Sequence, residues 1–409
     1  MKKTLSLLLV GIMMLSLIGC GGTSTSTSSP DTSVSTSVSA VETDVPTATA
    51  EPTATAEPTP TPEPTYSLKD IYAEHNMKVG TCLTTTMIDK PAHSNLILSQ
   101  FNSFTMENAM KPEATLNKEK SIEAGDLVVE FNNDVIRMLD WARENNFAVR
   151  GHTLVWHSQT PDWIFFEDFS TKNKPVSREV MLARLESYIK QVFEQLDTLG
   201  YSDMFYAFDV VNEAWMEDGK LRDSRWTEVV GDDFIWWAFY YANKYAPENI
   251  KLFYNDYNEQ FKEDTLVDFV STLVDEDGNS LIDGIGLQAH LYTSDDLDEY
   301  FSSIEKLGAT GLLLEMTELD VSLGAYQHTL IASEENLRIQ GQYYYNLITG
   351  LFERVEKGLI NMDSITFWGF TDSLSWRREA SPLLYNSMYK PKYAYYGAAL
   401  IKDMAGFDE

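Results

Sequence analysis

Residues 204–213 read Met-Phe-Tyr-Ala-Phe-Asp-Val-Val-Asn-Glu, a mostly apolar and aromatic run that ends in an amide and a carboxylic acid. Short runs rich in β-branched and aromatic residues are typical of buried strands. We therefore predict a strand over residues 204–211, with Asn212 and Glu213 at its carboxyl end.

The same pattern recurs along the rest of the chain. Including the first run, the predicted strands cover residues 77–83, 103–106, 147–154, 204–211, 250–254, 284–291, 311–316 and 364–370. Between them lie stretches with apolar residues at intervals of three and four, a spacing that is typical of helices. The clearest predicted helices cover residues 133–145, 178–199 and 335–357.

Strands that alternate with helices indicate a parallel sheet in an α/β domain. Both a closed (β/α)8 barrel and an open doubly wound sheet fit this alternation. Eight repeats without a glycine-rich phosphate loop favour the barrel. Because no Pro/Ser/Gly-rich segment interrupts the pattern after residue 66, we expect residues 67–409 to form one (β/α)8 (TIM) barrel domain.

The positions of the polar residues support the barrel, because its strands converge at one mouth. One at a time, such residues are commonly helix caps, solvated turns or satisfied core groups. Their coincidence at successive strand ends instead indicates one site. Seven predicted strands are followed by polar or aromatic residues, which are, in chain order, Glu107, Asn108, Lys111, His152, Trp156, His157, Gln159, Asn212, Glu213, Asn255, Asp256, Tyr257, Asn258, Gln288, His290, Glu318, Asp320, Trp368 and Trp376.

The composition excludes several classes of protein. The chain has 409 residues, of which 44% are hydrophobic, as in globular domains. Its 31 Lys and Arg against 62 Asp and Glu give a net charge of −31, so nucleic acid is not an expected partner. Cys20 and Cys82 could form at most one bridge, and only six histidines are present, which argues against a disulfide framework or a Cys/His zinc cluster.

The first twenty residues predict an export signal. Lys2 and Lys3 precede an apolar run over residues 5–18 that is too short to cross a bilayer comfortably. The run ends in Leu-Ile-Gly-Cys, which resembles a bacterial lipobox and implies that Cys20 becomes a lipid-modified N-terminus. The alternative is an ordinary signal peptide that contains a cysteine. In both cases we expect an extracellular protein, either a cell-surface lipoprotein held to the membrane only through Cys20 or a secreted protein.

Residues 21–66 predict a disordered tether. They consist almost entirely of Ser, Thr, Ala, Val, Pro, Glu and Asp, with Pro-Thr-Ala-Thr-Ala-Glu at 46–51 and again at 52–57. Such a composition cannot bury a core, and frequent prolines favour extended conformations. We expect a semi-stiff spacer between the leader and the barrel.

Five motifs in the predicted barrel resemble family ten of the glycoside hydrolases, the endo-1,4-beta-xylanases. Their order and spacing match across about residues 67–403. The resemblance implies a (β/α)8 barrel that cleaves internal β-1,4-xylosidic bonds of xylan, with Glu213 as acid/base and Glu318 as nucleophile. The motifs are Gly151-His-Thr-Leu-Val-Trp-His-Ser-Gln159, Asp209-Val-Val-Asn-Glu-Ala214, Tyr254-Asn-Asp-Tyr-Asn258, Thr317-Glu-Leu-Asp320 and Trp368-Gly-Phe-Thr-Asp372.

Two carboxyl groups suit the implied chemistry. Cleavage of an acetal needs a proton on the departing oxygen and a negative charge near the anomeric carbon. The retaining mechanism of the family implies carboxyl groups about 5 to 5.5 Å apart. It requires no metal or cofactor, and the expected partners are xylan and xylo-oligosaccharides bound by a monomer.

The resemblance also implies roles for the neighbouring residues. Asn212 corresponds to a residue that binds the sugar 2-hydroxyl, His290 to one that hydrogen-bonds the nucleophile, and Asp320 to the carboxylate behind that histidine. Tyr257 corresponds to an aromatic residue near the leaving group. The other implied positions are the glycone-side residues Glu107, Asn108, Lys111, His152, Trp156, Gln159 and Gln288, and the walls Trp368 and Trp376.

Three alternatives stay open at this point. A sugar-capture lipoprotein would also be tethered, but it would not need paired glutamates at the mouth. A lectin-like barrel without turnover would be expected to lack one of Glu213 and Glu318, and both are present. A β-glucanase or cellulase of the same fold is closer, because glucose differs from xylose by one hydroxymethyl group, and one small group typically changes specificity by only about 10- to 200-fold.

Overall fold

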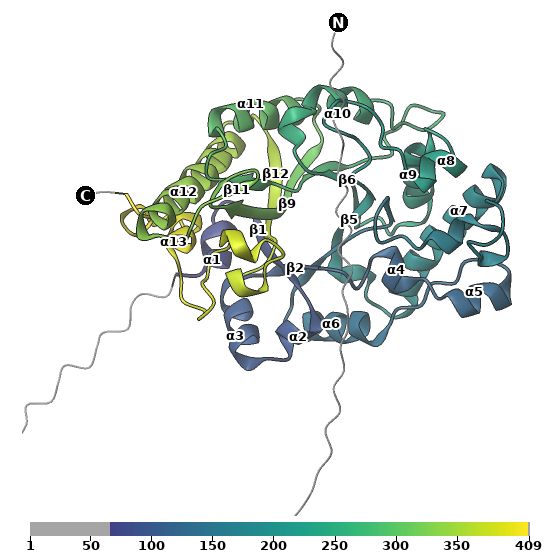
Figure 1. Ribbon diagram of the computed structural model, residues 1–409, viewed down its shortest axis with the longest axis horizontal. Helices are drawn as coiled ribbons and strands as arrows, with labels where there is room; N and C mark the ends of the chain where they lie inside the picture. The colour runs from purple at the N-terminus through teal and green to yellow at the C-terminus, as the bar shows by residue number, and fades with distance from the viewer. Residues whose placement is uncertain (1–65, 408–409) are drawn as a thin grey trace, which may run out of the picture. The chain divides into compact units, whose positions relative to one another are not determined.

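The computed structural model describes residues 66–407 (Figure 1). The leader, the predicted lipid attachment site Cys20 and the predicted tether up to residue 65 lie outside the described residues and stay predictions. None of the described helices is long and apolar enough to cross a membrane.

Eight parallel strands form a closed barrel, which confirms the predicted (β/α)8 architecture (Figure 1). The barrel closes because β12 pairs with both β1 and β9. Each strand overlaps one of the predicted runs. In chain order the barrel strands are β1 (Lys78–Leu83), β2 (Ser103–Met106), β3 (Ala148–Gly151), β5 (Phe205–Asn212), β6 (Lys251–Asp256), β7 (Gly284–Leu287), β9 (Leu313–Ser322) and β12 (Asn361–Phe367).

Four short strands extend the sheet structure at the mouth. They are β4 (Val155–Trp156), which pairs with β5, β8 (His290–Tyr292), which pairs with β9, and the hairpin of β10 (Gly324–Ala325) and β11 (His328–Thr329).

Three predicted strands were too long, and one of them, the run over 364–370, ends as strand β12 at Phe367. The run over 284–291 is divided into β7 and β8, because Ala289 has a left-handed backbone (φ 55°) that a continuous strand cannot contain. The run over 147–154 forms strand β3 only to Gly151, although the Leu154 amide still donates to the carbonyl of Asp209.

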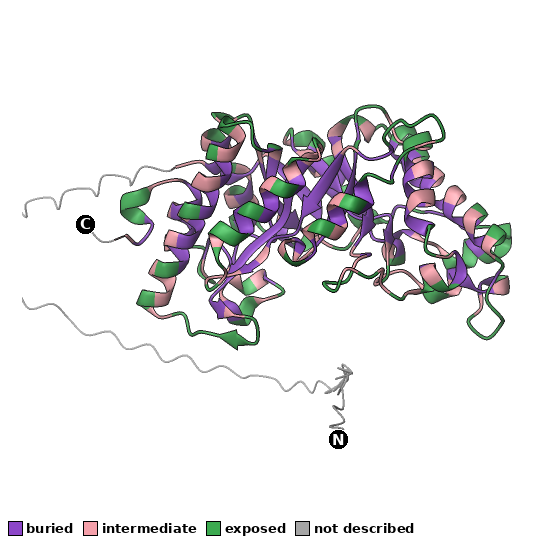
Figure 2. Cartoon of the chain, turned by 90° about the horizontal axis from the view of Figure 1, so that it is seen from above, coloured by how far each residue is buried: buried purple, intermediate pink, exposed green. Residues whose placement is uncertain are grey.

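Helices surround the barrel, and their outward faces are exposed while the strands are buried (Figure 2). Three of them match the predicted helices within one residue and begin with side-chain caps from Asn132, Ser177 and Ser333. The α-helices are α1 (Leu68–Ala73), α2 (Thr85–Ile88), α3 (Pro91–Gln100), α4 (Pro112–Thr115), α5 (Lys118–Ala124), α6 (Asn133–Glu144), α7 (Arg178–Thr198), α8 (Arg225–Val229), α9 (Phe234–Tyr245), α10 (Glu263–Val270), α11 (Leu297–Gly308), α12 (Glu334–Glu356) and α13 (Tyr393–Ala398). The 3-10 helices are η1 (Asp162–Phe165), η2 (Glu167–Phe169), η3 (Ser202–Met204), η4 (Glu259–Phe261), η5 (Asp372–Leu374), η6 (Arg378–Ala380) and η7 (Lys402–Met404).

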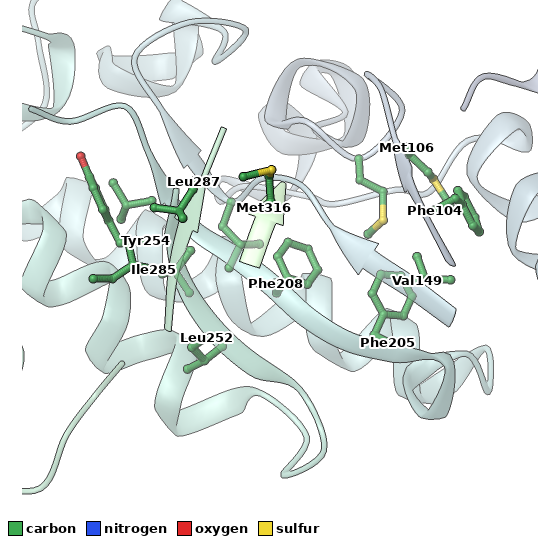
Figure 3. Close-up of a cluster of buried hydrophobic side chains, with 14 of the residues drawn as sticks. Phe104, Met106, Val149, Phe205, Phe208, Leu252, Tyr254, Ile285, Leu287 and Met316 are labelled. Carbon is green, nitrogen blue, oxygen red and sulfur yellow. The ribbon is translucent and has the colours of Figure 1, made fainter. Parts of the chain in front are cut away.

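The core contains large side chains from several strands of the barrel, such as Phe104, Phe208 and Leu287 (Figure 3). A glycine in β7 makes room for a polar residue among them. A Cβ atom on Gly286 would lie only 2.3 Å from Oδ1 of Asn255. Glycine at this position therefore lets the Asn255 side chain lie across β7 toward the mouth of the barrel.

Candidate active site

A cleft of about 900 Å³ lies at the carboxyl ends of the strands. It brings together residues from loops that are far apart in the sequence. All of the predicted catalytic and substrate-binding residues line it except Asn108 and Asp320. The predicted residues in the lining are Glu107, Lys111, His152, Trp156, Gln159, Asn212, Glu213, Tyr257, Gln288, His290, Glu318, Trp368 and Trp376.

Sharp turns follow several strands at the cleft, and two of them carry the predicted residues Gln159 and Glu213. Gln159, Glu213, Asn258 and Ala289 all have positive φ angles, between 42° and 55°. Such backbone conformations cost on the order of 1 kcal/mol or more in residues other than glycine, and persist where surrounding contacts fix them. At Glu213 the fixing contacts are its amide, which donates to the Asn255 carbonyl (2.9 Å), and its carbonyl, which accepts from Arg222 Nε (2.9 Å).

Glu318 is buried on β9 with both carboxylate oxygens in contact with polar groups. Asn255 Nδ2 donates to Oε1 at 2.9 Å, and His290 Nε2 lies 3.3 Å from Oε2. Burial alone raises the pKa of Glu318, but the hydrogen bond and charge of His290 outweigh burial, so the pKa is lowered. Glu318 is therefore an ionised carboxylate at neutral pH, as a nucleophile must be.

His290 lies between two carboxylates. Its Nδ1 is 3.2 Å from Oδ2 of Asp320, on the side opposite Glu318. Burial opposes protonation of the imidazole, but Asp320 and Glu318 outweigh burial and raise its pKa to about 10. Asp320 is completely buried and also accepts from Trp376 Nε1 (3.0 Å) and Arg377 Nη1 (2.6 Å). Asp320 thus lies behind His290, where the resemblance placed it, and does not line the cleft.

Glu213 has a different set of neighbours. Trp156 Nε1 donates to its Oε2 at 3.0 Å, while Gln288 Nε2 and Asn212 Nδ2 donate to Oε1 at 3.1 and 3.2 Å. All three donors are neutral, whereas Glu318 contacts a cationic imidazole. The two carboxyl groups of the cleft therefore occupy electrostatically distinct environments.

Two amides connect the two glutamates. Asn255 Nδ2 donates to Oδ1 of Asn212 (2.9 Å) as well as to Glu318, and Asn212 in turn donates to Glu213. Asn255 is oriented by Thr317 Oγ1, which donates to its Oδ1 at 2.6 Å. The sequence placed Asn255 at a strand end but gave it no role. Its place two residues before the predicted leaving-group residue Tyr257 was the available indication.

At one end of the cleft, Lys111 is held by two side-chain oxygens. Its Nζ donates to Asn108 Oδ1 (3.1 Å) and Gln159 Oε1 (2.9 Å) and lies 4.8 Å from the Trp156 ring centre. Asn108 also accepts from Gln159 Nε2 (3.2 Å). Asn108, one of the implied glycone-side residues, is exposed outside the lining, and its side chain positions Lys111 and Gln159.

Below the mouth, a buried ionic cluster supports His152. His152 Nδ1 lies 2.8 Å from Oδ2 of Asp209, which forms a two-pronged ion pair with Arg150. Arg150 Nε also donates to Glu315 Oε2 at 2.7 Å. Sequence reasoning assigned nothing to Arg150, Asp209 or Glu315. Their signal was a charged residue inside each of three otherwise apolar predicted strands.

The other end of the cleft is lined by residues that the sequence did not predict. They lie in loops without a regular pattern, so no signal singled them out. These residues are Glu217, Gln260, Phe261, Tyr292, Asp295, Tyr326 and Arg377, and the lining there also includes Asn258, which the sequence placed at a strand end without giving it a role. Within residues 66–407, no three His, Cys, Asp or Glu side chains are arranged to hold a metal ion.

The whole domain resembles known proteins in sequence. The chain is 40% identical over 344 residues to endo-1,4-beta-xylanase B of Butyrivibrio fibrisolvens, a match that covers 81% of this chain and 52% of that protein. It is 37% identical over 316 residues to exoglucanase XynX of Acetivibrio thermocellus, which covers 76% of this chain and 27% of that protein. The chain thus spans about half or less of the length of these relatives.

Solved structures show the same fold. The CBM22-1-GH10 modules of Clostridium thermocellum endo-1,4-beta-D-xylanase 10B, complexed with xylohexaose, superpose with a TM-score of 0.74 at 34% identity, over 82% of this chain and 68% of that one. The model of glycosyl hydrolase family 10 matches residues 67–400. With this match across the complete barrel, the chain belongs to glycosyl hydrolase family 10.

Proposed function

We propose that the barrel hydrolyses internal β-1,4 bonds of xylan by a retaining double displacement. The observation that carries this proposal is the pair Glu213 and Glu318 in one cleft, one beside neutral donors and the other beside a protonated histidine. The names of the relatives and the xylohexaose in the related structure support xylan as the substrate.

In the first step, a Glu318 carboxylate oxygen attacks the anomeric carbon while the bond to the leaving oxygen breaks. Glu213 gives its proton to that oxygen, and a glycosyl ester with Glu318 forms. In the second step, Glu213 takes a proton from water as the water oxygen attacks the anomeric carbon, and the ester bond to Glu318 breaks. Asn212 contacts Glu213 directly and is linked to Glu318 through Asn255, a position that supports its implied role in binding the sugar 2-hydroxyl.

Substitutions of the two glutamates test these roles. Glu318→Ala should lower kcat at least ~10⁴-fold on every substrate, because no covalent intermediate can form. Glu213→Ala should lower kcat on xylan about 10²- to 10⁴-fold, but much less on aryl xylobiosides with good leaving groups, which need little protonation. Equal losses for Glu213→Ala on both kinds of substrate would contradict its role as the acid.

The substrate is tested by reducing-sugar release and product sizes from unsubstituted xylan and carboxymethyl cellulose. Internal cleavage of xylan at a rate far above that of cellulose is expected, with Glu318→Ala as the control. Cellulose is the second candidate substrate, because one relative is named an exoglucanase. Tight binding of either polysaccharide without cleavage would point to a capture protein instead.

A further inference from the structure

The proposed acid/base Glu213 lies just beyond the end of its strand, whereas the proposed nucleophile lies within one. Glu318 is inside β9, which covers Leu313–Ser322, and sheet pairing continues past it. On β5 the pairing ends at Asn212, and the next residue, Glu213, has a left-handed backbone (φ 55°). An acid must lie within hydrogen-bond reach of the leaving oxygen, and misplacement by about 1 Å can cost about 100-fold in rate. Contacts outside the sheet must therefore hold the backbone after Glu213.

One side chain binds two successive backbone amides directly after Glu213. The amides of Ala214 and Trp215 both donate to the hydroxyl oxygen of Tyr254, at 3.0 and 3.2 Å. The hydroxyl in turn donates to Oδ2 of Asp256. One proton and two lone pairs are thus all engaged. Burial and the Asp256 carboxylate raise the pKa of Tyr254 well above its usual value, so the oxygen keeps its proton.

A buried lysine adds a third contact to the same segment. Lys262 Nζ donates to the Trp215 carbonyl and to Asp256 Oδ1, both at 2.8 Å, and its ion pair with Asp256 is completely buried. Asp256 Oδ1 also accepts from the Tyr257 amide at 2.9 Å. Tyr254, Asp256 and Lys262, which we call the Tyr254 clamp, therefore bind both the amide and the carbonyl of Trp215.

The Tyr254 ring is itself held between β6 and α10. It is completely buried, and its hydroxyl points away from the labelled core side chains (Figure 3). The Phe269 ring on α10 meets the Tyr254 ring edge-on, with centroids 5.1 Å apart and planes at 68°. The centroid of the same Phe269 ring lies 5.5 Å from that of Trp215. The hydroxyl thus has a fixed position from which it holds the segment after Glu213.

We propose that Tyr254 is a positioning residue for Glu213, because its hydroxyl fixes the backbone that carries the acid/base carboxyl. Glu318 has other partners, namely Asn255 and His290. Loss of the Tyr254 hydroxyl should therefore impair proton transfer to the leaving oxygen and spare the attack by Glu318. This inference rests on the proposed retaining mechanism and adds to it a residue that acts through Glu213.

The test compares Tyr254→Phe with the parent on two substrates that differ in their need for the acid. The quantity to compare is kcat/KM, because it covers the steps up to departure of the leaving group and not the later attack by water. On xylohexaose, whose leaving sugar needs the proton, kcat/KM should fall about 10- to 100-fold. On 2,4-dinitrophenyl xylobioside, whose leaving group departs without a proton, it should stay within about threefold.

Tyr72→Phe is the matched control. Tyr72 is also completely buried, and its hydroxyl donates to the Ala398 carbonyl at 3.2 Å, away from the cleft lining. This variant should keep kcat/KM on both substrates within about twofold of the parent. Circular dichroism shows whether Tyr254→Phe is folded. If it is not, Asp256→Asn takes its place, because it removes the charge that the Tyr254 hydroxyl contacts, and the same selective loss on xylohexaose is expected.

The outcomes separate this inference from the proposed function. Unchanged kcat/KM on xylohexaose would overturn the inference alone, since Glu213 would then keep its position without the hydroxyl. Equal losses on the two substrates would also overturn it, because they would show a general distortion of the cleft. A parent enzyme that cleaves neither substrate would overturn the proposed function, and this inference with it.

Discussion

The barrel contains two clusters of buried charges that are balanced differently. The lower cluster consists of Arg150, Asp209 and Glu315, and the nucleophile cluster of Glu318, His290, Asp320 and Arg377. The lower cluster lies farther from the mouth of the barrel than the nucleophile cluster, because Glu315 precedes Glu318 along β9. In the lower cluster one arginine faces two carboxylates, with His152 at the edge. In the nucleophile cluster two cations face two carboxylates.

The pKa values follow this balance. In the nucleophile cluster, burial raises the pKa of Asp320, but His290 and Arg377 outweigh burial and the pKa falls. In the lower cluster, Arg150 and His152 outweigh burial and lower the pKa of Asp209, whereas Arg150 compensates the burial of Glu315 only in part, so the pKa of Glu315 rises from 4.5 to about 7. One oxygen of Glu315, Oε1, is buried without a hydrogen-bond partner. The carboxylates of the nucleophile cluster are thus fully compensated, as the proposed chemistry requires. In the lower cluster, Glu315 is compensated only in part.

The largest expected effect comes from breaking the lower cluster. Arg150→Met would leave Asp209 and Glu315 buried without their cation, and we expect the free energy of unfolding to fall by about 3–5 kcal/mol. Urea denaturation at pH 7 measures the loss. Arg137→Met is the matched control, because Arg137 pairs with Asp89 at the exposed surface and should contribute about 1 kcal/mol or less. A loss as small as that of the control would show that Arg150 does not compensate the two carboxylates.

A substitution in the nucleophile cluster should have an intermediate effect, and the property that it changes is activity. Asp320→Asn removes the charge behind His290, so the pKa of the imidazole should fall below about 10. The interaction of His290 with Glu318 should then weaken. We expect kcat on xylan to fall on the order of 10- to 100-fold through misplacement of the nucleophile. NMR titration can follow the imidazole, since the chain has only six histidines.

The control for Asp320→Asn is Asp203→Asn, which removes a carboxylate from the exposed pair with Arg143. It should leave both kcat and the titration of His290 unchanged. A fall in kcat for Asp320→Asn without a change in the imidazole pKa would mean that Asp320 acts through packing and not through charge.

The sequence predicted the barrel and most of the cleft because both depend on local patterns. Apolar runs locate all eight barrel strands, and polar residues directly after them include Glu213 and Glu318. The break between β7 and β8 was missed, since a left-handed alanine such as Ala289 has no sequence signal. The roles of the amides were missed for another reason: Asn255 reaches Glu318 only because Gly286 leaves space across β7.

The lower cluster was missed because its pairs connect strands that are distant in sequence. Arg150 and Glu315 are 165 residues apart along the chain, and no pattern within either run indicates the partner. A charge inside an apolar strand indicates a buried ion pair in general, but the partner and the charge balance emerge only when the barrel closes. The aromatic residues Phe261 and Tyr326 likewise come from a turn and a hairpin whose course the sequence does not reveal.

The smallest expected effect is on how the free energy of unfolding depends on pH, and it distinguishes the two clusters. Because the folded state raises the pKa of Glu315 above its ordinary value, the protein favours the protonated carboxyl, and stability is lost as pH rises from about 4.5 to about 7. Glu315→Gln cannot ionise, so its stability relative to the parent should rise across this window, by at most about 1.4 kcal/mol per pH unit, with little further gain above about pH 7.5.

Urea denaturation at pH 5, 6, 7 and 8 measures the difference between Glu315→Gln and the parent. Glu130→Gln is the control, because hydrogen bonds from Lys120 and Asn117 lower the pKa of Glu130, so its carboxyl stays ionised over this range and its difference from the parent should not change with pH. A difference for Glu315→Gln that stays constant over the four pH values would mean that Arg150 compensates both carboxylates fully. The lower cluster would then be balanced like the nucleophile cluster, and the contrast between the two would be wrong.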